Sequence, residues 1–337
     1  KGYIKRTTSD TFKSQNRGGV GIKGMSTNEE DFVEHMINIQ THDHVLFFTN
    51  KGKVYRLKGY EIPEFSRQAK GLPVVNLLPI EKGEMVNSII KLSTDEEVSN
   101  LLFVTKSGLV KRTAVSEFDS IRSGGKICIT LKEDDELIAV RKTNGTDYVL
   151  LGSSSGRMVK FNENDVRIMG RTASGVKGIE LDGSSCIGAE IASDEDVVMI
   201  VTKKGYGKQT SVREYRETKR GSKGVKALSI TDKNGEIASF KIARPDTDIV
   251  IITDSGMVMR MDTDQISTLG RVTQGVRLIK LKDDQFVATI ALVDKEKEEE
   301  QIEEIENSDN VVEQVITEDE SVGNIEVIST ESSEVTE

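Results

Sequence analysis

Several residue types and patterns that mark common protein classes are scarce or absent in this sequence. Among 337 residues there are two cysteines, three histidines, four prolines and no tryptophan. No run of about 18 apolar residues exists to span a bilayer. The first residues, Lys1–Arg6, lack the apolar core of a signal peptide, and the absence of an initial methionine indicates a fragment of a longer protein. The composition therefore predicts a soluble, globular chain.

The few cysteines and histidines do not form a metal-binding pattern. Cys128 and Cys186 lie among apolar residues without the spacing of a zinc site, which is typical of unpaired core thiols in a reducing cytoplasm. His42 and His44, with His35 nearby, lack a thiolate or a fixed third ligand, so a surface or packing role is favoured over metal binding. We expect no disulfide, no metal site and a cytoplasmic location.

Motifs for catalysis are also missing. There is no Gly-Lys-Ser/Thr loop to hold phosphates, so the chain is not expected to bind or hydrolyse ATP. The acidic pairs Asp134–Asp135 and Asp283–Asp284 fall at repeated turns, where turn chemistry explains them better than acid–base catalysis. The run Ser153–Ser155 replaces a turn and lacks the surroundings of a nucleophile. The sequence predicts a non-catalytic domain with no cofactor of its own.

What the sequence does contain is a sixfold internal repeat marked by pairs of glycines. The first glycines are Gly2, Gly52, Gly108, Gly156, Gly205 and Gly256, and the second are Gly21, Gly71, Gly125, Gly175, Gly224 and Gly275. Five pairs are 19 residues apart and the third is 17 apart. A unit that recurs about every 50 residues indicates a solenoid, a propeller or an array.

Each repeat has the pattern of four short strands. Apolar runs such as Val45–Thr49 end in a turn with glycine, and a second strand such as Lys53–Leu57 follows, which is a hairpin signal. A third strand follows the second glycine, as in Gly275–Leu281, and a fourth follows an acidic turn, as in Phe286–Ile290. Only Thr27–Gln40 has a modest helical pattern. We therefore predict an all-β, six-bladed propeller of four-stranded antiparallel blades.

The charge is divided unevenly between two segments. Residues 294–337 carry 17 acidic and 2 basic side chains, a net of −15, whereas residues 1–293 carry 44 basic and 39 acidic side chains, a net of +5. The acidic segment has no aromatic residue and cannot bury enough apolar surface to fold, so a disordered tail is predicted after residue 293. This asymmetry favours a body, residues 1–293, that binds a polyanion.

Basic residues recur at fixed positions within the repeats. An arginine stands four residues before most second glycines, and another basic residue stands three or four residues after each first glycine. Solubilising charges or local salt bridges are the usual explanation, but the recurrence favours a basic belt around the ring. Point charges without an aromatic stacking platform fit the phosphates of duplex DNA better than single strands. The residues expected to contact DNA are Lys5, Arg6, Arg17, Lys23, Arg56, Arg67, Lys70, Lys111, Arg112, Arg122, Lys160, Arg171, Lys177, Lys208, Arg220, Lys223, Arg260, Arg271 and Arg277.

One segment of the first repeat, Gln15–Gly21, is not repeated. Together with six repeats it resembles the heptapeptide box of the gyrase A C-terminal domain family, the DNA-wrapping domains of DNA gyrase, whose pattern is Gln, basic, Arg, Gly, Gly, basic, Gly. The matching residues are Gln15, Arg17, Gly18, Gly19 and Gly21, and the departures are Asn16 and Val20. Each departure removes a charge, for which Lys13 and Lys23 offer compensation. The resemblance covers residues 1–293.

The resemblance implies a six-bladed β-pinwheel, in which neighbouring blades exchange a strand and duplex DNA wraps with positive handedness around the outer rim. In the family, the box joins the first and last blades, and Arg17 is the expected phosphate contact. The parent enzyme uses ATP and magnesium to introduce negative supercoils. It joins this domain to an N-terminal cleavage domain, which carries the catalytic tyrosine, and to the gyrase B protein, in a bacterial complex of two A and two B subunits. The domain alone is expected to be monomeric, cytoplasmic and free of membrane contacts.

Two other interpretations remain open. The C-terminal domain of topoisomerase IV belongs to a decatenating relative, and in it the box is degraded or missing and the blades are often fewer. The second is a propeller that serves as a protein-interaction scaffold or a glycan enzyme. That class predicts a functional face or a central pocket, and binding that depends little on salt.

Overall fold

The computed structural model describes most of the repeated part of the chain. The described residues are 3–6, 22–23, 37, 39–66, 69–92, 100–282 and 284–295, with backbone only at 22, 23 and 294. Residues 1–295 form one compact unit. The predicted helix at 27–40 falls almost wholly outside the described residues, and the predicted disordered tail falls outside them except for its first two residues.

Five β-hairpins form the middle of the blades. They are β3 (His44–Thr49) with β4 (Lys53–Lys58), β7 (Asn100–Thr105) with β8 (Leu109–Ala114), β11 (Tyr148–Ser153) with β12 (Arg157–Asn162), β15 (Val197–Thr202) with β16 (Tyr206–Ser211), and β19 (Thr247–Thr253) with β20 (Met257–Asp262). Their sequences are rich in β-branched and aromatic residues, and each turn ends in a first glycine with positive φ. The predicted hairpins are therefore confirmed.

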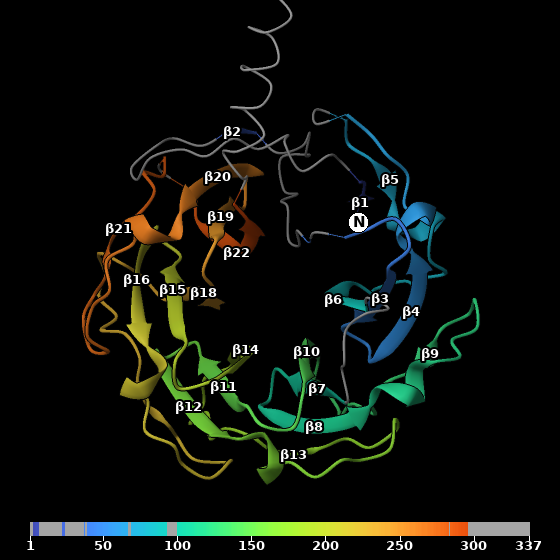
Figure 1. Ribbon diagram of the computed structural model, residues 1–337, viewed down its shortest axis with the longest axis horizontal. Helices are drawn as coiled ribbons and strands as arrows, with labels where there is room; N and C mark the ends of the chain where they lie inside the picture. The colour runs from blue at the N-terminus through green and yellow to red at the C-terminus, as the bar shows by residue number, and fades with distance from the viewer. Residues whose placement is uncertain are drawn as a thin grey trace, which may run out of the picture. The chain divides into compact units, whose positions relative to one another are not determined.

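An inner strand pairs with the first strand of each hairpin. The inner strands are β6 (Val86–Leu92), β10 (Leu137–Thr143), β14 (Cys186–Ala192), β18 (Ile237–Ala243) and β22 (Val287–Asp294). Successive inner strands lie side by side and face the middle of the ring of blades (Figure 1).

The outer strand of each blade comes from the following repeat. These short strands are β9 (Lys126–Ile127), β13 (Val176–Lys177), β17 (Val225–Lys226) and β21 (Val276–Arg277), which pair with β4, β8, β12 and β16. Figure 1 shows β13 and β21 outside β8 and β16. In the last blade, β2 (Ile22–Lys23) from the first repeat pairs with β20, so the two ends of the repeat series are joined by backbone hydrogen bonds. The strand exchange expected from the resemblance is present.

The prediction of six four-stranded blades is wrong for the described part of the chain. Its residues form five four-stranded sheets and one two-stranded sheet, in which β1 (Tyr3–Ile4) pairs with β5 (Leu72–Pro73). The first repeat instead contributes β1 to the small sheet and β2 to the last blade.

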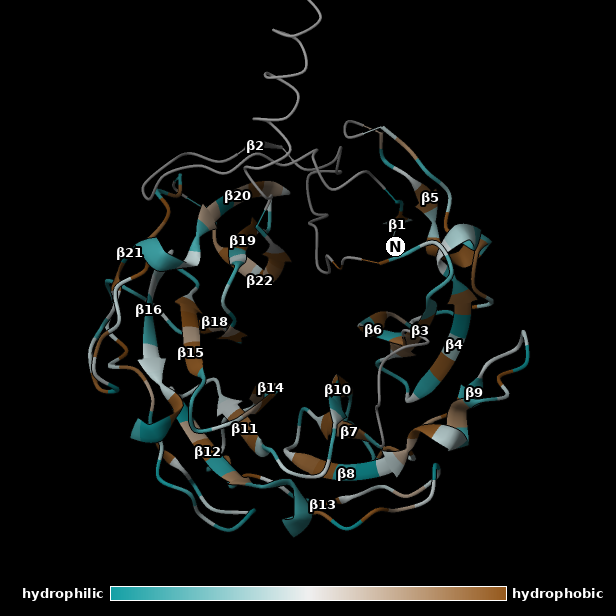
Figure 2. Ribbon diagram, in the orientation of Figure 1, coloured by the Kyte–Doolittle hydropathy of each residue, from teal (hydrophilic) through white to brown (hydrophobic). Residues whose placement is uncertain are grey.

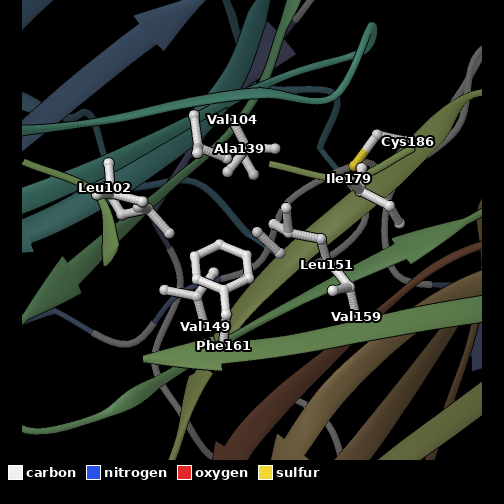
Figure 3. Close-up of a cluster of buried hydrophobic side chains, with 12 residues drawn as sticks. Leu102, Val104, Ala139, Val149, Leu151, Val159, Phe161, Ile179 and Cys186 are labelled. Atoms are coloured by element: carbon white, nitrogen blue, oxygen red, sulfur yellow. The ribbon is translucent and has the colours of Figure 1, made fainter. Parts of the chain in front are cut away.

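The hydrophobic core lies between neighbouring blades. One cluster joins Leu102 and Val104 of β7 to Val149 and Leu151 of β11 and Phe161 of β12 (Figure 3). The intervening side chain of β11, Leu150, packs on the opposite face with the following repeat. Because both faces of the hairpins are covered, β15 is buried nearly throughout and has the hydrophobic colour in Figure 2.

The third strand of each repeat is shorter than predicted. The alternation after Gly275 predicts a strand to Leu281, whereas β21 contains two residues. Beyond them, the Leu278 amide donates to the Gly205 carbonyl, at 2.9 Å, so the chain turns across the hairpin end of the preceding repeat. The part of the chain that the structure describes contains no helix with the length and hydropathy of a bilayer span.

The close approach between repeats can be tested at Gly175, the second glycine of the fourth repeat. Gly175 has a φ of +93°, and a Cβ there would lie 2.6 Å from the Val110 carbonyl oxygen. We expect Gly175→Ala to lower the free energy of unfolding by about 2–4 kcal/mol, because backbone strain and a steric clash add. The midpoint of urea unfolding measures this.

A matched control lies in the same repeat. Gly183 also has positive φ, at +84°, but a Cβ there meets no heavy atom within 4 Å. Gly183→Ala is therefore expected to cost about 1–2 kcal/mol from backbone strain alone. Equal losses in the two variants would contradict the proposed packing of Gly175 against β8.

Candidate nucleic-acid interface

The basic residues predicted to face DNA fall into four groups in the structure. Exposed side chains are Arg122, Lys177, Arg220, Lys223 and Arg277; half-buried side chains are Lys5, Arg6, Arg56, Lys70, Arg171 and Arg271; buried side chains are Lys111, Arg112, Lys160, Lys208 and Arg260; and Arg17, Arg67 and the Lys23 side chain are outside the described residues. The box Gln15–Gly21 is also outside them. The prediction of a uniform outer belt at these positions is therefore wrong.

Three lysines of the odd-numbered repeats bind loop carbonyls of the next repeat. Lys111 is fully buried, and its Nζ donates to the carbonyls of Gly170 and Arg171 in the fourth repeat, at 3.3 and 2.5 Å, and to that of Cys128 in its own repeat, at 2.6 Å. Lys208 donates to the equivalent loop of the sixth repeat, and Lys5 to that of the second. The ammonium groups are satisfied by backbone oxygen atoms, so these lysines join neighbouring repeats.

The basic side chain four residues after the first glycine reaches the 3-10 turn of the following repeat. Arg112 donates to the Val166 carbonyl at 2.7 Å and forms an ion pair with Glu163 at 2.8 Å, both groups being buried. Arg56 donates to the carbonyl that follows η4 (Val115–Phe118). Lys160 likewise reaches η6 (Val212–Glu214). Arg260 departs from this pattern, because it pairs within its own hairpin.

In the fourth, fifth and sixth repeats, the arginine four residues before the second glycine is also a link between repeats. Arg171 donates to the Ile127 carbonyl, Arg220 to Lys177 and Arg271 to Lys226. Each acceptor lies on the outer strand of the preceding repeat. The recurrence of basic residues thus reflects the assembly of the blades, and Lys111, Arg112, Lys160, Lys208 and Arg260 are too buried to bind a phosphate backbone.

A different set of basic residues recurs at one position of the backbone pairing register, at the outer edge of the blades. In every four-stranded blade, the outer strand pairs with the second strand of the hairpin. The cross-strand pair nearest the hairpin turn includes a basic residue. The pairs are Lys53 with Ile127, Leu109 with Lys177, Arg157 with Lys226, Tyr206 with Arg277, and Met257 with Lys23. We call these six basic residues the edge belt. Cross-strand partners share one face of a sheet, so the edge belt follows from the pairing register.

Local contacts position the edge belt. Arg157 donates to the carbonyls of Lys223 and Gly224, at 3.3 and 3.0 Å, and Arg277 lies over the Tyr206 ring and donates to its hydroxyl. The side chains of Arg157, Lys177, Lys226 and Arg277 are exposed. Such a row can bind a polyanion through charge-assisted hydrogen bonds.

Sequence reasoning missed part of this surface. Lys53, Arg157 and Lys226 were not predicted, nor was Lys219, whose side chain is 88% exposed. Lys226 follows its second glycine by two residues, as Lys177 and Arg277 follow theirs, so that spacing was an available signal. The place of Arg157 at the outer edge follows from its pairing with Lys226.

The remaining candidate groups have packing roles. Cys128 and Cys186 are buried free thiols, and burial raises the pKa of each to about 12, which makes them poor nucleophiles.

Both ring nitrogens of His44 lie within 3.3 Å of the Arg56 guanidinium. Burial, followed by the charges of Arg56 and Lys58, lowers the pKa of His44. Within the described residues, no three potential ligands gather around a metal position.

The buried lysines give a testable dependence of stability on pH. Burial lowers the pKa of Lys111 to about 8 from 10.5, so between these values the unfolded chain binds more protons and the lysine's contribution to stability rises with pH. Lys111→Met is expected to cost about 1–3 kcal/mol at pH 7, because three carbonyls lose a donor. The difference between the two proteins in unfolding free energy should grow from pH 8 to 10.5.

Urea unfolding across this pH range measures the effect, and Lys106→Met is the control. Lys106 is an exposed lysine of the same hairpin, so its replacement should change stability by less than about 0.5 kcal/mol. If Lys111→Met unfolds like the parent chain at every pH, the proposed link through Lys111 is excluded.

Comparisons with known proteins agree with the repeat and its blades. The family described as DNA gyrase C-terminal domain, beta-propeller, matches in six segments: residues 1–40, 43–101, 99–144, 147–193, 196–244 and 247–294. The six sequence repeats are thus found independently of the five complete blades.

Individual relatives give the same result. The chain is similar to the DNA gyrase A protein of Staphylococcus aureus (strain MRSA252), with 47% identity over 340 residues that cover 98% of this chain and 38% of that protein. The chain therefore spans less than two fifths of the relative's length. The fold is similar to a solved gyrase A C-terminal domain, with a TM-score of 0.77, 24% identity, and coverage of 86% of this chain and 96% of that one.

A topoisomerase IV C-terminal domain is also similar in structure, with a TM-score of 0.69, 25% identity, and coverage of 91% of this chain and 95% of that one. The family match extends over nearly the whole repeated region, and the Staphylococcus aureus relative is almost twice as similar in sequence as either solved structure. This chain belongs to the DNA gyrase C-terminal domain family of β-propellers.

Proposed function

We propose that this domain binds duplex DNA along the outer edge of its blades and bends it around the ring. The observation that carries the proposal is the edge belt, which supplies at least one basic residue at the outer edge of each four-stranded blade. Half-buried and exposed arginines of the neighbouring loops, such as Arg122, Arg171 and Arg271, extend it. Of the predicted contacts, Lys5, Arg6, Arg56, Lys70, Arg17 and Arg67 remain part of this proposal.

The chemistry of the edge favours the DNA backbone over base readout. Duplex DNA has a persistence length of about 50 nm, so tight bending costs on the order of several kcal/mol and needs many phosphate contacts. Lysine and arginine side chains provide such contacts without requiring a sequence. Phosphate groups arranged along a bent duplex can meet successive blades in turn.

The names of the relatives suggest the larger context. We propose that the parent protein is the A component of a bacterial, cytoplasmic gyrase, in which this domain wraps DNA with positive handedness so that strand passage introduces negative supercoils. The gyrase B protein and the N-terminal cleavage domain would be its partners, and ATP and magnesium would act there. The box Gln15–Gly21 would support wrapping, since β2, which follows it directly, pairs with the last blade.

The topoisomerase IV C-terminal domain is the second candidate, because its fold is also similar to this chain. Its proposed role would be selection of DNA geometry during decatenation. The greater identity to the gyrase A protein favours the first candidate.

The dependence of DNA affinity on salt tests the proposal. Replacing Lys177, Lys226 and Arg277 together by alanine should reduce the slope of log K against log salt by about 3, because each lost phosphate contact removes about 0.9. Fluorescence anisotropy with a labelled duplex of unrelated sequence, titrated between low and moderate salt, measures the slope.

The control removes three charges from the opposite end of the blades. Lys58 ends β4, Arg213 lies in η6, and Arg244 follows β18, and all three are exposed. Replacing them by alanine should leave the slope nearly unchanged. Equal losses in the two triple variants would mean that binding reflects net charge alone, and binding by the parent chain that barely weakens with salt would contradict the proposal.

A further inference from the structure

A loop of the fifth repeat resembles Gln15–Gly21 at three of its seven positions. Residues 218–224 read Thr-Lys-Arg-Gly-Ser-Lys-Gly, with arginine, glycine and glycine at the third, fourth and seventh positions of both segments. Lysines occupy the second and sixth positions, where the first segment has Asn16 and Val20. The later segment thus shares three residues with Gln15–Gly21 and has two charges that the earlier one lacks.

The loop 218–224 is held firmly on the preceding blade. The Thr218 amide donates to a carbonyl of β12 at 2.8 Å, and the Gly221 amide donates to the Gly178 carbonyl at 2.6 Å. Arg220 donates from Nε to the Asp165 carbonyl and from Nη1 to β13, at 3.1 and 3.0 Å. These bonds fix the guanidinium and leave Nη2 available to an anion.

The two lysines of the loop project from this fixed backbone. Lys219 and Lys223 have side-chain exposures of 88% and 55%. Each pairs with one carboxylate, Asp165 at 3.0 Å and Asp182 at 2.8 Å. Ion pairs at such exposed positions contribute little to stability, so the ammonium groups of the two lysines can be shared with a phosphate at small cost.

Two edge-belt residues, Arg157 and Lys177, contact the loop directly. The backbone carbonyls of Lys223 and Gly224 accept hydrogen bonds from Arg157, and the loop continues directly into β17, which contains Lys226. The six cations at this edge are Arg157, Lys177, Lys219, Arg220, Lys223 and Lys226. The carboxylates paired with them are those of Asp165, Glu180 and Asp182, so a net positive charge remains.

No other described loop before a second glycine has as many basic residues. The equivalent loop of the fourth repeat, residues 169–175, contains Arg171 alone, and that of the sixth, residues 269–275, contains Arg271 alone. Among these loops, basic residues are therefore concentrated in 218–224, next to the blade formed by β11 and β12.

We propose that loop 218–224 is a second box-like element that binds phosphates of duplex DNA and is the strongest single anchor of the wrapping surface. The inference rests on the proposed function and adds a location to it. A rigid loop loses little conformational entropy when it binds, so its cations contribute more than those on freely moving side chains. The two similar segments lie in the first and fifth repeats, and a wrapped duplex would contact both.

The test compares two pairs of charges on the same surface. In the 337-residue chain, Lys219→Ala/Lys223→Ala is expected to weaken binding of a labelled duplex by about tenfold or more and to reduce the salt slope by about 2. Lys177→Ala/Arg277→Ala removes the same charge outside the loop and should weaken binding less. Equal or smaller losses from the loop variant would overturn the anchor. A labelled polyglutamate peptide should bind the parent chain only weakly. If the loop variant lost affinity for this peptide but not for the duplex, the proposed anchor would also be overturned.

Site-directed crosslinking gives an independent readout of position. Cys128 and Cys186 are buried, so a new surface cysteine can be labelled with a photoreactive group. A label at Lys219→Cys should crosslink duplex DNA, whereas a label at Arg213→Cys, six residues earlier, should not. If the unlabelled chain binds DNA but position 219 does not crosslink, the anchor is wrong and the proposed function stands. If the unlabelled chain does not bind DNA, both fail.

Discussion

The exchange of the short outer strand between repeats is the constraint on which this structure depends. Each repeat from the second to the sixth supplies only three strands to its own blade, so no four-stranded blade is complete without a strand from another repeat. The outer pairing is two residues long, which alone would be weak. It is reinforced by cores between blades and by the basic side chains Lys111, Arg112 and Arg171, which reach from strand or loop into the adjacent repeat.

This use of basic side chains separates two roles that look alike in sequence. Lysines and arginines inside the blades bind carbonyls and carboxylates, and their role is assembly. Those of the outer strands, including Lys177, Lys226 and Arg277, remain exposed because the strand that bears them is at the edge of its sheet. The same exchange that joins the repeats thus also places one row of cations on the outside, where a phosphate backbone can reach it.

The hairpins could be predicted from sequence because runs such as Val45–Thr49 and a glycine turn determine local structure by themselves. The length of the third strand could not, since the alternation after Gly275 continues where the chain has already left the sheet edge. Nor could the burial of Lys111 and Lys208, because a basic residue that recurs in every other repeat is equally compatible with an outer belt and with contacts between blades. Which of these occurs depends on how the next repeat packs, and that is a tertiary property. The box Gln15–Gly21 was recognised by its pattern, whereas the similar segment at 218–224 has serine and threonine in place of glycine and glutamine.

The most direct test of DNA wrapping measures DNA topology. Nicked circular DNA is ligated in the presence of the 337-residue chain, the protein is removed, and the linking number of the closed circles is determined by two-dimensional gel electrophoresis. Wrapping along the outer edge with positive handedness predicts that linking number increases in proportion to bound protein, and that the increase falls when Lys219 and Lys223 are replaced by alanine. An unchanged linking number at saturating protein would contradict the central claim that the ring of blades wraps DNA.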